Sequence, residues 1–317
     1  MHSREAAAAE QHASVSLGWR VVDALISARR SRLATPLAKL KPLLLLAPGL
    51  ALATILAIGL VRLAWSSLHS YDSFLGTQGH FSFTQYSQVV SDPQFKTVLV
   101  RTLTMAVVTS LIAVTFAVPF SLVMARASRR FVRLALMVIV FIPYLTGDIT
   151  RTFGWLAALG PNGPVAWVCQ QLGLQPPTLI GTLWAVGLGS VQVLLPAAVV
   201  ILLPGVLRLD PELEQAARTL GARPHQVFLR VVLPQLRVAC FSALTVCWAF
   251  AMGDFADPGI LGQGVKDYLA NLLQDRYLAI GNQPLGSAVG MFLLFAVLAG
   301  AAVILTLSRV RWQGRRL

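Results

Sequence analysis

The chain has 317 residues, of which 56% are hydrophobic and only 12% are charged. Soluble domains carry about 25% charged residues, so this composition excludes an ordinary soluble enzyme, a disordered chain and a disulfide scaffold, and indicates a protein surrounded mostly by lipid. The formal net charge of +13 would suit nucleic acid or an anionic membrane surface, and the placement of the charges has to decide between them. The three cysteines and five histidines lack metal-ligand or redox spacing, so we expect neither a metal site nor a cofactor.

Six apolar stretches are candidate membrane spans, because a helix needs about 20 mostly apolar residues to cross a hydrocarbon layer of about 30 Å. In chain order they are residues 43–65, 102–125, 134–147, 178–204, 238–253 and 285–308. The third is short and is interrupted by Pro143 and Gly147. The sequence therefore predicts an all-α integral membrane protein with six transmembrane helices. Core helices of a soluble protein are the alternative, but several of them would then lack any polar face.

The basic residues are distributed unevenly between the segments that alternate with these spans. Twenty of the 26 Lys and Arg residues fall in segments 1–42, 126–133, 205–237 and 309–317. The positive-inside rule makes these segments, and with them both termini, cytoplasmic. The predicted organisation is a cytoplasmic tail (1–42), a retained transmembrane anchor (43–65), a periplasmic loop (66–97), a transmembrane domain (98–308) and a cytoplasmic tail (309–317). The positive charge is thus a topology signal that favours membrane lipid, and not nucleic acid, as its partner.

The cytoplasmic segment 205–237 has the pattern of two short helices. Asp210 fits an N-cap, and Gly221 fits the C-terminal stop of the first helix. A second short helix over 224–233 then leads to Pro234 and the fifth span. This predicts a two-helix loop on the inner face of the membrane, between spans four and five. A simple interfacial amphipathic loop is the alternative.

This loop also carries a spaced motif. It consists of Gln215, Ala216, Ala217, Gly221, Val231, Leu233 and Pro234. The motif resembles the signature loop of bacterial ABC importer permeases of the binding-protein-dependent, MetI-like type, whose family form is Glu-Ala-Ala, three residues, Gly, nine residues, Ile, one residue, Leu-Pro. Chance agreement at all seven positions is on the order of one in ten thousand for this composition.

Weaker matches extend the resemblance to about residues 98–308. They are Pro143-Tyr144, the run from Thr150 to Trp155, Gly253-Asp254-Phe255, and the run from Gln283 to Ala288. These stretches resemble the spermidine/putrescine-type permeases most closely. The resemblance implies that the cargo is a polyamine. Iron(III), a phosphonate, thiamine or another small solute remains open as the cargo within the same class.

The resemblance implies a set of partners: a dimer of cytoplasmic ABC ATPase subunits, a second permease subunit that is a paralogue, and a periplasmic substrate-binding protein. The inner loop would bind the ATPase. The residues implied in this coupling are Glu214, Gln215, Ala216, Ala217, Gly221, Val231, Leu233 and Pro234. The family has Glu where this chain has Gln215; Glu214 could supply the acid, but it points about 100° around the helix.

The sequence predicts a transport subunit without enzymatic activity of its own. A phosphate-binding loop of the Gly-x4-Gly-Lys-Ser/Thr type is absent from it, and no catalytic set of side chains can be assembled on one side of the membrane. An autonomous channel or secondary carrier is the alternative from another class. It would leave the inner-loop motif without a purpose, and a membrane-embedded enzyme would lack candidate residues.

The broken ends of spans three and five are the predicted substrate pathway, because short spans interrupted by Gly and Pro mark binding sites in transporters. The candidate residues are Tyr144, Asp148, Arg151, Trp248, Asp254, Phe255 and Asp257, with Trp155 nearby. Carboxylates attract a cationic polyamine, and aromatic faces add cation–π contacts. The alternative is structural, since aspartates at span ends also cap helices or pair with an arginine such as Arg151.

Overall fold

The structure, a computed structural model, describes residues 36–72 and 77–313. Most of the predicted N-terminal tail, residues 1–35, and the last four residues of the C-terminal tail lie outside the described residues. The described chain divides after Arg62 into two units, which are treated separately below.

The first unit contains most of helix α2 (Pro36–Ser67). Its stretch Leu46–Ser67 is apolar and long enough to cross a membrane. Hydrophobic side chains along this stretch, such as Leu52 and Ile55, are exposed, as expected of a helix whose solvent is lipid. The helix contains the whole of the first predicted span.

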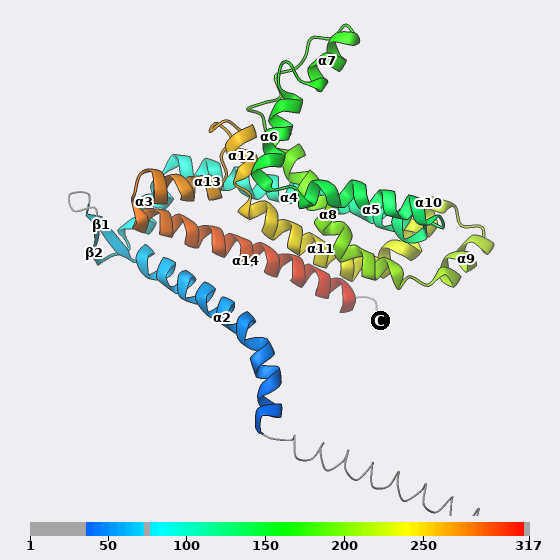
Figure 1. Cartoon of the computed structure of the whole chain (residues 1–317), viewed down its shortest axis with the longest axis horizontal. Helices are drawn as coiled ribbons and strands as arrows, with labels where there is room; N and C mark the ends of the chain where they lie inside the picture. Colours follow the sequence, from blue (N-terminus) through cyan, green and yellow to red (C-terminus); the bar gives the residue numbers. More distant parts are fainter. Residues whose placement is uncertain (1–35, 73–76, 314–317) are drawn as a thin grey trace, which may run out of the picture. The chain divides into compact units, whose positions relative to one another are not determined.

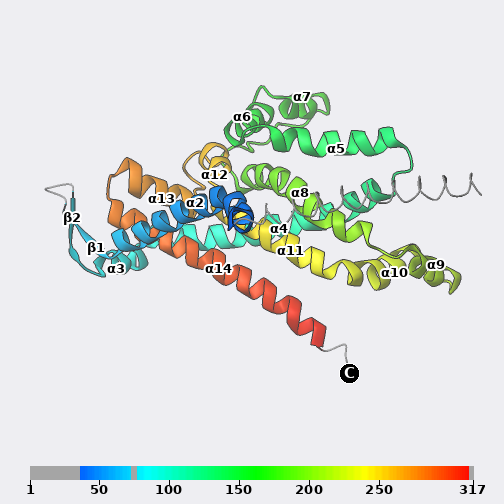
Figure 2. The same ribbon diagram turned by 60° about the horizontal axis from the view of Figure 1, so that its bottom comes forward.

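Three long helices of the second unit pack side by side and enclose its main core (Figures 1 and 2). They are α4 (Pro93–Arg126), α8 (Leu183–Leu207) and α11 (Leu233–Gly253). Fully buried alanines lie on all three helices, including Ala106, Ala113, Ala198 and Ala243. Small side chains let helix backbones approach closely where lipid supplies no hydrophobic driving force. These helices cover most of predicted spans two, four and five.

Helix α14 (Gln283–Gln313) packs against α11 and contains the predicted sixth span. At Gly300 of α14, an added Cβ would lie 2.3 Å from the ring of Trp248 on α11. The glycine therefore makes room for the tryptophan, whose Nε1 donates a hydrogen bond to the carbonyl of Val297 at 3.2 Å.

The predicted periplasmic loop contains regular structure. Strands β1 (His69–Asp72) and β2 (Thr77–Phe81) form an antiparallel pair, and helix α3 (Thr84–Ser91) follows. The prediction of an all-α chain is therefore wrong in this segment. The strands are only 4 and 5 residues long, and no apolar alternation announces them; Gly79 permits them by leaving room for the Ser70 side chain.

The predicted third span is a bent pair of helices. Helix α5 (Arg130–Leu145) ends two residues after Pro143. The stretch Asp148–Gln171, which begins with α6 (Asp148–Leu159), is bent away from it by 103°. Thr146 (φ −73°, ψ 134°) and Gly147 (φ −58°, ψ 145°) between them lie outside the helical region, which separates the two helices. The break expected from Pro143 and Gly147 is confirmed, and the short helix α7 (Pro164–Gln171) follows it.

The first helix of the inner loop is confirmed with both of its predicted ends. Helix α9 (Pro211–Thr219) begins with the Asp210 carboxylate, which accepts the amide of Glu212 at 2.9 Å. It ends at Gly221, whose φ of +81° places it in the left-handed region. The amides of Gly221 and Ala222 donate back to the carbonyls of Arg218 and Ala217 at 2.9 and 3.1 Å, which is a Schellman stop.

The second helix of the loop is not a separate element. Helix α10 (Pro224–Val227) runs through a π-helical turn, η1 (Phe228–Val232), directly into α11 and forms one stretch with it, Pro224–Gly253. The predicted boundary at Pro234 is therefore wrong. A proline lacks the amide that an α-helix needs, and the π turn, in which Leu233 donates to the carbonyl of Phe228, carries the helix past it.

Five described helices are apolar and long enough to cross a membrane, and the bent pair α5–α6 brings the number to six if it counts as one span. The six spans predicted from the sequence are therefore the upper limit of this count. In both views, α9 and α10 lie at one end of the long helices, and α3 and α13 (Leu269–Gln274) lie at the other end (Figures 1 and 2).

Candidate functional site: an acidic cavity and an inner-loop helix

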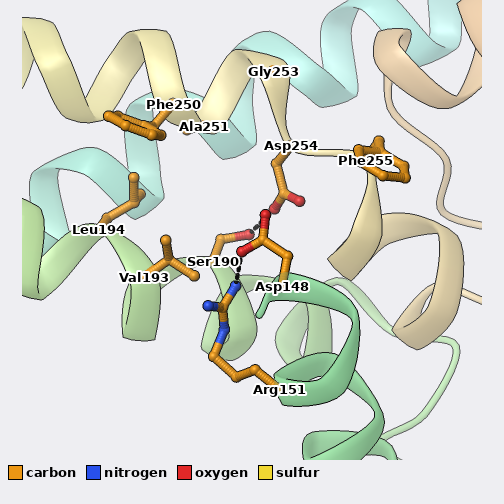
Figure 3. A pocket seen from close by; sticks show the side chains of 10 residues that line it. All are labelled: Asp148, Arg151, Ser190, Val193, Leu194, Phe250, Ala251, Gly253, Asp254 and Phe255. Carbon is orange, nitrogen blue, oxygen red and sulfur yellow. Dashed lines mark hydrogen bonds and ion pairs between the residues drawn. The ribbon is translucent and has the colours of Figure 1, made fainter. Parts of the chain in front are cut away.

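A cavity of about 150 Å³ lies where α6, α8 and the end of α11 meet. Asp148 and Arg151 come from α6, and Ser190 comes from α8. Asp254 and Phe255 come from the segment that joins α11 to the short helix α12 (Ala256–Leu261). Figure 3 shows these polar side chains on one side of the cavity, with Phe250, Val193 and Leu194 nearby. The break after α5 and the end of α11 together therefore build one small polar chamber.

Asp254 is the carboxylate held most firmly by polar contacts in this chamber. Its Oδ2 accepts the Ser190 hydroxyl at 2.7 Å, and its Oδ1 accepts the backbone amide of Asp257 at 3.3 Å. Asp254 lies one residue beyond the apolar stretch that ends at Gly253. Burial, and then the nearby Asp257, raise the pKa of Asp254 to about 7.

Asp257 lies directly behind the chamber and does not line it. It is 1% exposed, and its Oδ1 accepts the Thr152 hydroxyl of α6 at 2.7 Å. Gly189 of α8 makes room for this carboxylate, because an added Cβ there would lie 2.7–2.9 Å from its atoms. Burial raises the pKa of Asp257, while the Thr152 hydrogen bond and the Arg151 charge act in the opposite direction.

The third aspartate has a cationic partner. Asp148 accepts a hydrogen bond from Arg151 at 2.5 Å, within the first turns of α6. The arginine side chain is 7% exposed and the aspartate side chain is 64% exposed. The predicted alternative role, an ion pair with Arg151, is thus present for Asp148. Asp254 and Asp257 have no ion pair among the described side chains, so the chamber carries more acidic than basic groups.

The predicted aromatic residues divide into those at the chamber and those away from it. Phe255 lines the chamber. Tyr144 and Trp248 do not line it, since Tyr144 lies on the last turn of α5 and Trp248 is buried against α14. Trp155 is also outside its lining, and it donates to the side-chain oxygen of Gln192. Tyr144, Trp155 and Trp248 therefore lie outside the lining of this chamber, and their place in the substrate pathway stays a prediction.

The sequence prediction lacked two residues of the chamber lining that matter here, Ser190 and Phe250, as well as Thr152 behind it; it also lacked the apolar lining residues Val193, Leu194 and Ala251. Ser190 was detectable, because it and Gln192 are the polar residues in the middle of an apolar span, where polar side chains are rare. Phe250 looked like any other lipid-facing residue of α11.

The inner loop presents its motif residues in two groups. Gln215 and Ala216 on α9 are exposed, as is Gly221, and Ala217 is partly buried; the later residues Val231, Leu233 and Pro234 are partly buried where η1 enters α11. Glu214 is different, because it is buried and forms an ion pair with Arg126 at the end of α4. The exposed part of the motif is thus limited to the outer side of α9 and its turn.

Comparison with known proteins places this architecture. Residues 117–317 match the family described as "Binding-protein-dependent transport system inner membrane component". The chain is 28% identical over 280 residues to the inner membrane ABC transporter permease protein YdcU of Escherichia coli, covering 82% of this chain and 89% of the relative. It is 27% identical over 239 residues to the spermidine/putrescine transport system permease protein PotB of the same organism, covering 75% and 84%.

The fold resembles a solved bacterial transporter as well. A chain from the crystal structure of a bacterial alginate ABC transporter, in complex with an alginate pentasaccharide-bound periplasmic protein, superposes with a TM-score of 0.69 at 17% identity. The match covers 86% of this chain and 96% of the other. With its family match over more than half of its length, its apolar helices and its permease relatives, the chain belongs to the binding-protein-dependent inner membrane components and is a permease subunit of an ABC importer.

Proposed function

We propose that this permease subunit translocates a polyamine such as putrescine or spermidine. Two independent lines support the proposal. The PotB relatives are named for spermidine and putrescine transport, and YdcU-like and PotB-like chains align with most of this one. The chamber between α6, α8 and α11 is lined by the Asp254 carboxylate, which has no basic partner among the described side chains, and Asp257 lies directly behind it, which suits a cation.

The observation that carries the proposal is the position of Asp254. Its carboxylate faces the chamber, is oriented by Ser190, and has Phe255 beside it (Figure 3). A buried carboxylate is costly without a compensating positive charge, and an ammonium group would supply one. Phenylalanine faces add about 0.5–2 kcal/mol to the binding of a cation at partly desolvated sites. The chamber therefore fits one amine of an extended polyamine at a time.

The proposal includes the direction of coupling. Helix α9 would seat in a cytoplasmic ATPase subunit, with both chain termini on the cytoplasmic side. A periplasmic binding protein would deliver the polyamine from the other side. A second, paralogous permease subunit would complete the pathway. Three features of α9 support this role: its Asp210 N-cap, its turn at Gly221 and the exposed small residue Ala216. They give a short helix with defined ends and a small exposed side chain, which can bind in a cleft of the partner.

Uptake of radiolabelled putrescine and spermidine by cells that express the complete transporter tests the cargo. Asp254→Asn should lower uptake by about tenfold or more, since a desolvated charge contact contributes about 1.5–3 kcal/mol. Asp275→Asn is the matched control, because Asp275 is an exposed aspartate without an ion pair in the described structure. If neither putrescine nor spermidine is taken up, and neither competes for uptake at a saturating concentration, the polyamine proposal is wrong.

Co-purification tests the coupling. The wild-type chain should retain ATPase subunits from detergent-solubilised membranes, and Gly221→Asp should lose them. Polyamine uptake should be lost in the same variant that loses the ATPase subunits. Flux from this chain alone in liposomes, driven by a gradient and without ATP, would instead make it an autonomous channel or carrier.

A further inference from the structure

The attachment of α9 to the rest of the chain carries an inference beyond its exposed motif. Among the described elements, the close backbone neighbours of α9 are α10 and η1, which follow it in sequence. At its other end it is joined to α8 by residues 208–210. Neither of these links reaches α4. A side-chain contact does reach it: the ion pair between Arg126 and Glu214 joins α9 to α4.

This ion pair joins residues 88 positions apart in sequence. Arg126 is the last residue of α4, and its side chain is 49% exposed; the Glu214 side chain is 10% exposed. A cavity of about 340 Å³, lined by both residues and by Gln215 and Arg218, adjoins the pair. The space beside the pair is therefore not filled by dense apolar packing, and the ion pair is a polar contact that spans it.

Glu214 and Gln215 divide the two sides of α9 between them. Consecutive residues of an α-helix point about 100° apart. Glu214 turns inward to Arg126, whereas Gln215 and Ala216 are exposed. The acid next to the motif is therefore committed inside the chain and is not presented to a partner on the exposed side. Its inward position agrees with the expectation that Glu214 points about 100° around the helix from Gln215.

We propose that Arg126 and Glu214 are a positioning pair that fastens α9 to α4, so that α9 moves α4 together with α8 and α11. The inference rests on the proposed coupling role of α9. The three long helices pack against one another. Chain connections link α9 to two of them, and the ion pair adds the third. A displacement of α9 then moves the three-helix core as one body and reaches the chamber, whose residues lie on α8 and beyond α11.

The complete transporter, with its ATPase subunits and its binding protein, tests this pair. The readouts are the ATPase retained on purification, the basal ATP hydrolysis, and the stimulation of hydrolysis by the purified binding protein. Arg126→Gln should keep the ATPase and the basal rate near those of wild type, and both Arg126→Gln and Glu214→Gln should lose stimulation by the binding protein. Stimulation should fall by about tenfold, which is within the range by which single residues change coupling between sites. Glu212→Gln, an exposed acid on the same helix, and Arg129→Gln are the matched controls and should behave as wild type.

Two rescue experiments separate positioning from a loss of folding. Exchanging the charges, Arg126→Glu with Glu214→Arg, should restore most of the stimulation. In a chain freed of its native cysteines, Arg126→Cys with Glu214→Cys can be bridged by a reducible bifunctional thiol reagent. Bridged protein should be stimulated, and the same preparation should lose the stimulation after reduction.

The possible results discriminate between the proposals. Stimulation that is unchanged in both single variants overturns the positioning pair, as does a rescue that fails in both forms. If Glu214→Gln loses the ATPase itself, Glu214 is a contact to that subunit and the positioning pair is wrong. If wild-type protein retains no ATPase, the coupling role falls and the positioning pair falls with it. If polyamine uptake alone is absent, while the ATPase is retained and its hydrolysis is stimulated by the binding protein, only the proposed cargo is wrong.

Discussion

Gly189 decides whether the carboxylate of Asp257 can lie against α8. An added Cβ would lie 2.7–2.9 Å from the carboxylate atoms, closer than real contacts allow. We expect Gly189→Ala to lower the free energy of unfolding by about 1–3 kcal/mol, as overpacking does in well-packed sites. The apparent melting temperature of the purified protein measures this. Gly154→Ala on α6 is the control, because nothing lies within 4 Å of its added Cβ. Equal melting temperatures for the two variants would contradict the close approach.

Asp254 gives the site a dependence on pH. Its pKa is raised to about 7 by burial and by Asp257, whereas an aspartate in an unfolded chain titrates near 4. Between these values, the folded protein keeps a proton that the unfolded chain has released. The contribution to stability is therefore complete below about pH 4 and is lost as the pH rises through about 7. We expect Asp254→Asn to flatten the decline in melting temperature over this range relative to Asp275→Asn. If the melting temperature falls with pH at the same slope in both variants, Asp254 does not cause this pH dependence.

The residues of the site show which signals a sequence carries. The three aspartates were predicted to lie together because charged groups rarely occur at membrane depth without a function. Asp148 and Asp254 do line one cavity, with Asp257 behind Asp254. The aromatic residues carried no such signal, because Trp248 serves equally well as packing against Gly300. Whether an aromatic residue faces the chamber or packs on another helix depends on where the neighbouring helices lie, and the sequence of one helix does not contain that information.

Helix α9 and its stop form a single structural element. Gly221 has a φ of +81°, and nothing lies within 4 Å of a Cβ added there, so the glycine is required by backbone conformation and not by space. A non-glycine residue in this region costs about 1–3 kcal/mol, and asparagine tolerates it best. We therefore expect Gly221→Ala to weaken ATPase retention in a pull-down more than Gly221→Asn does. Equal retention by both variants would show that the left-handed turn does not limit docking.

The elements also show where local reasoning fails. The caps of α9 were predictable, since Asp210 and Gly221 act through bonds within their own turn. The predicted helix boundary at Pro234 was wrong, because whether a proline ends a helix depends on the backbone of the residues before it. The π turn at Phe228–Val232 leaves Pro234 inside a continuous helix. Strands β1 and β2 were missed because short pairs depend on each other's hydrogen bonds and less on their own composition.

At the scale of the whole molecule, hydropathy located the long helices because the cost of burying charge in lipid acts on every span alike. The angle of 103° between α5 and the stretch Asp148–Gln171 was not predictable. Pro143 and Gly147 indicate a break, but its direction depends on the packing of α6 on α12. The break matters for the site, because it is what brings Asp148 and Arg151 to the end of α11.

The charge asymmetry of the chain makes its orientation testable. Twenty of 26 basic residues lie in the segments assigned to the cytoplasm, and moving arginines across the membrane would be costly. In a chain without its native cysteines, we expect Ser128→Cys between α4 and α5, and Thr219→Cys at the end of α9, to react with an impermeant maleimide only after the cells are permeabilised. Ser91→Cys, at the end of α3, should react in cells whose inner membrane is intact. All three positions are exposed, so access to the reagent and not burial decides the result. Labelling in the opposite order would invert the topology and would remove α9 from reach of any cytoplasmic ATPase.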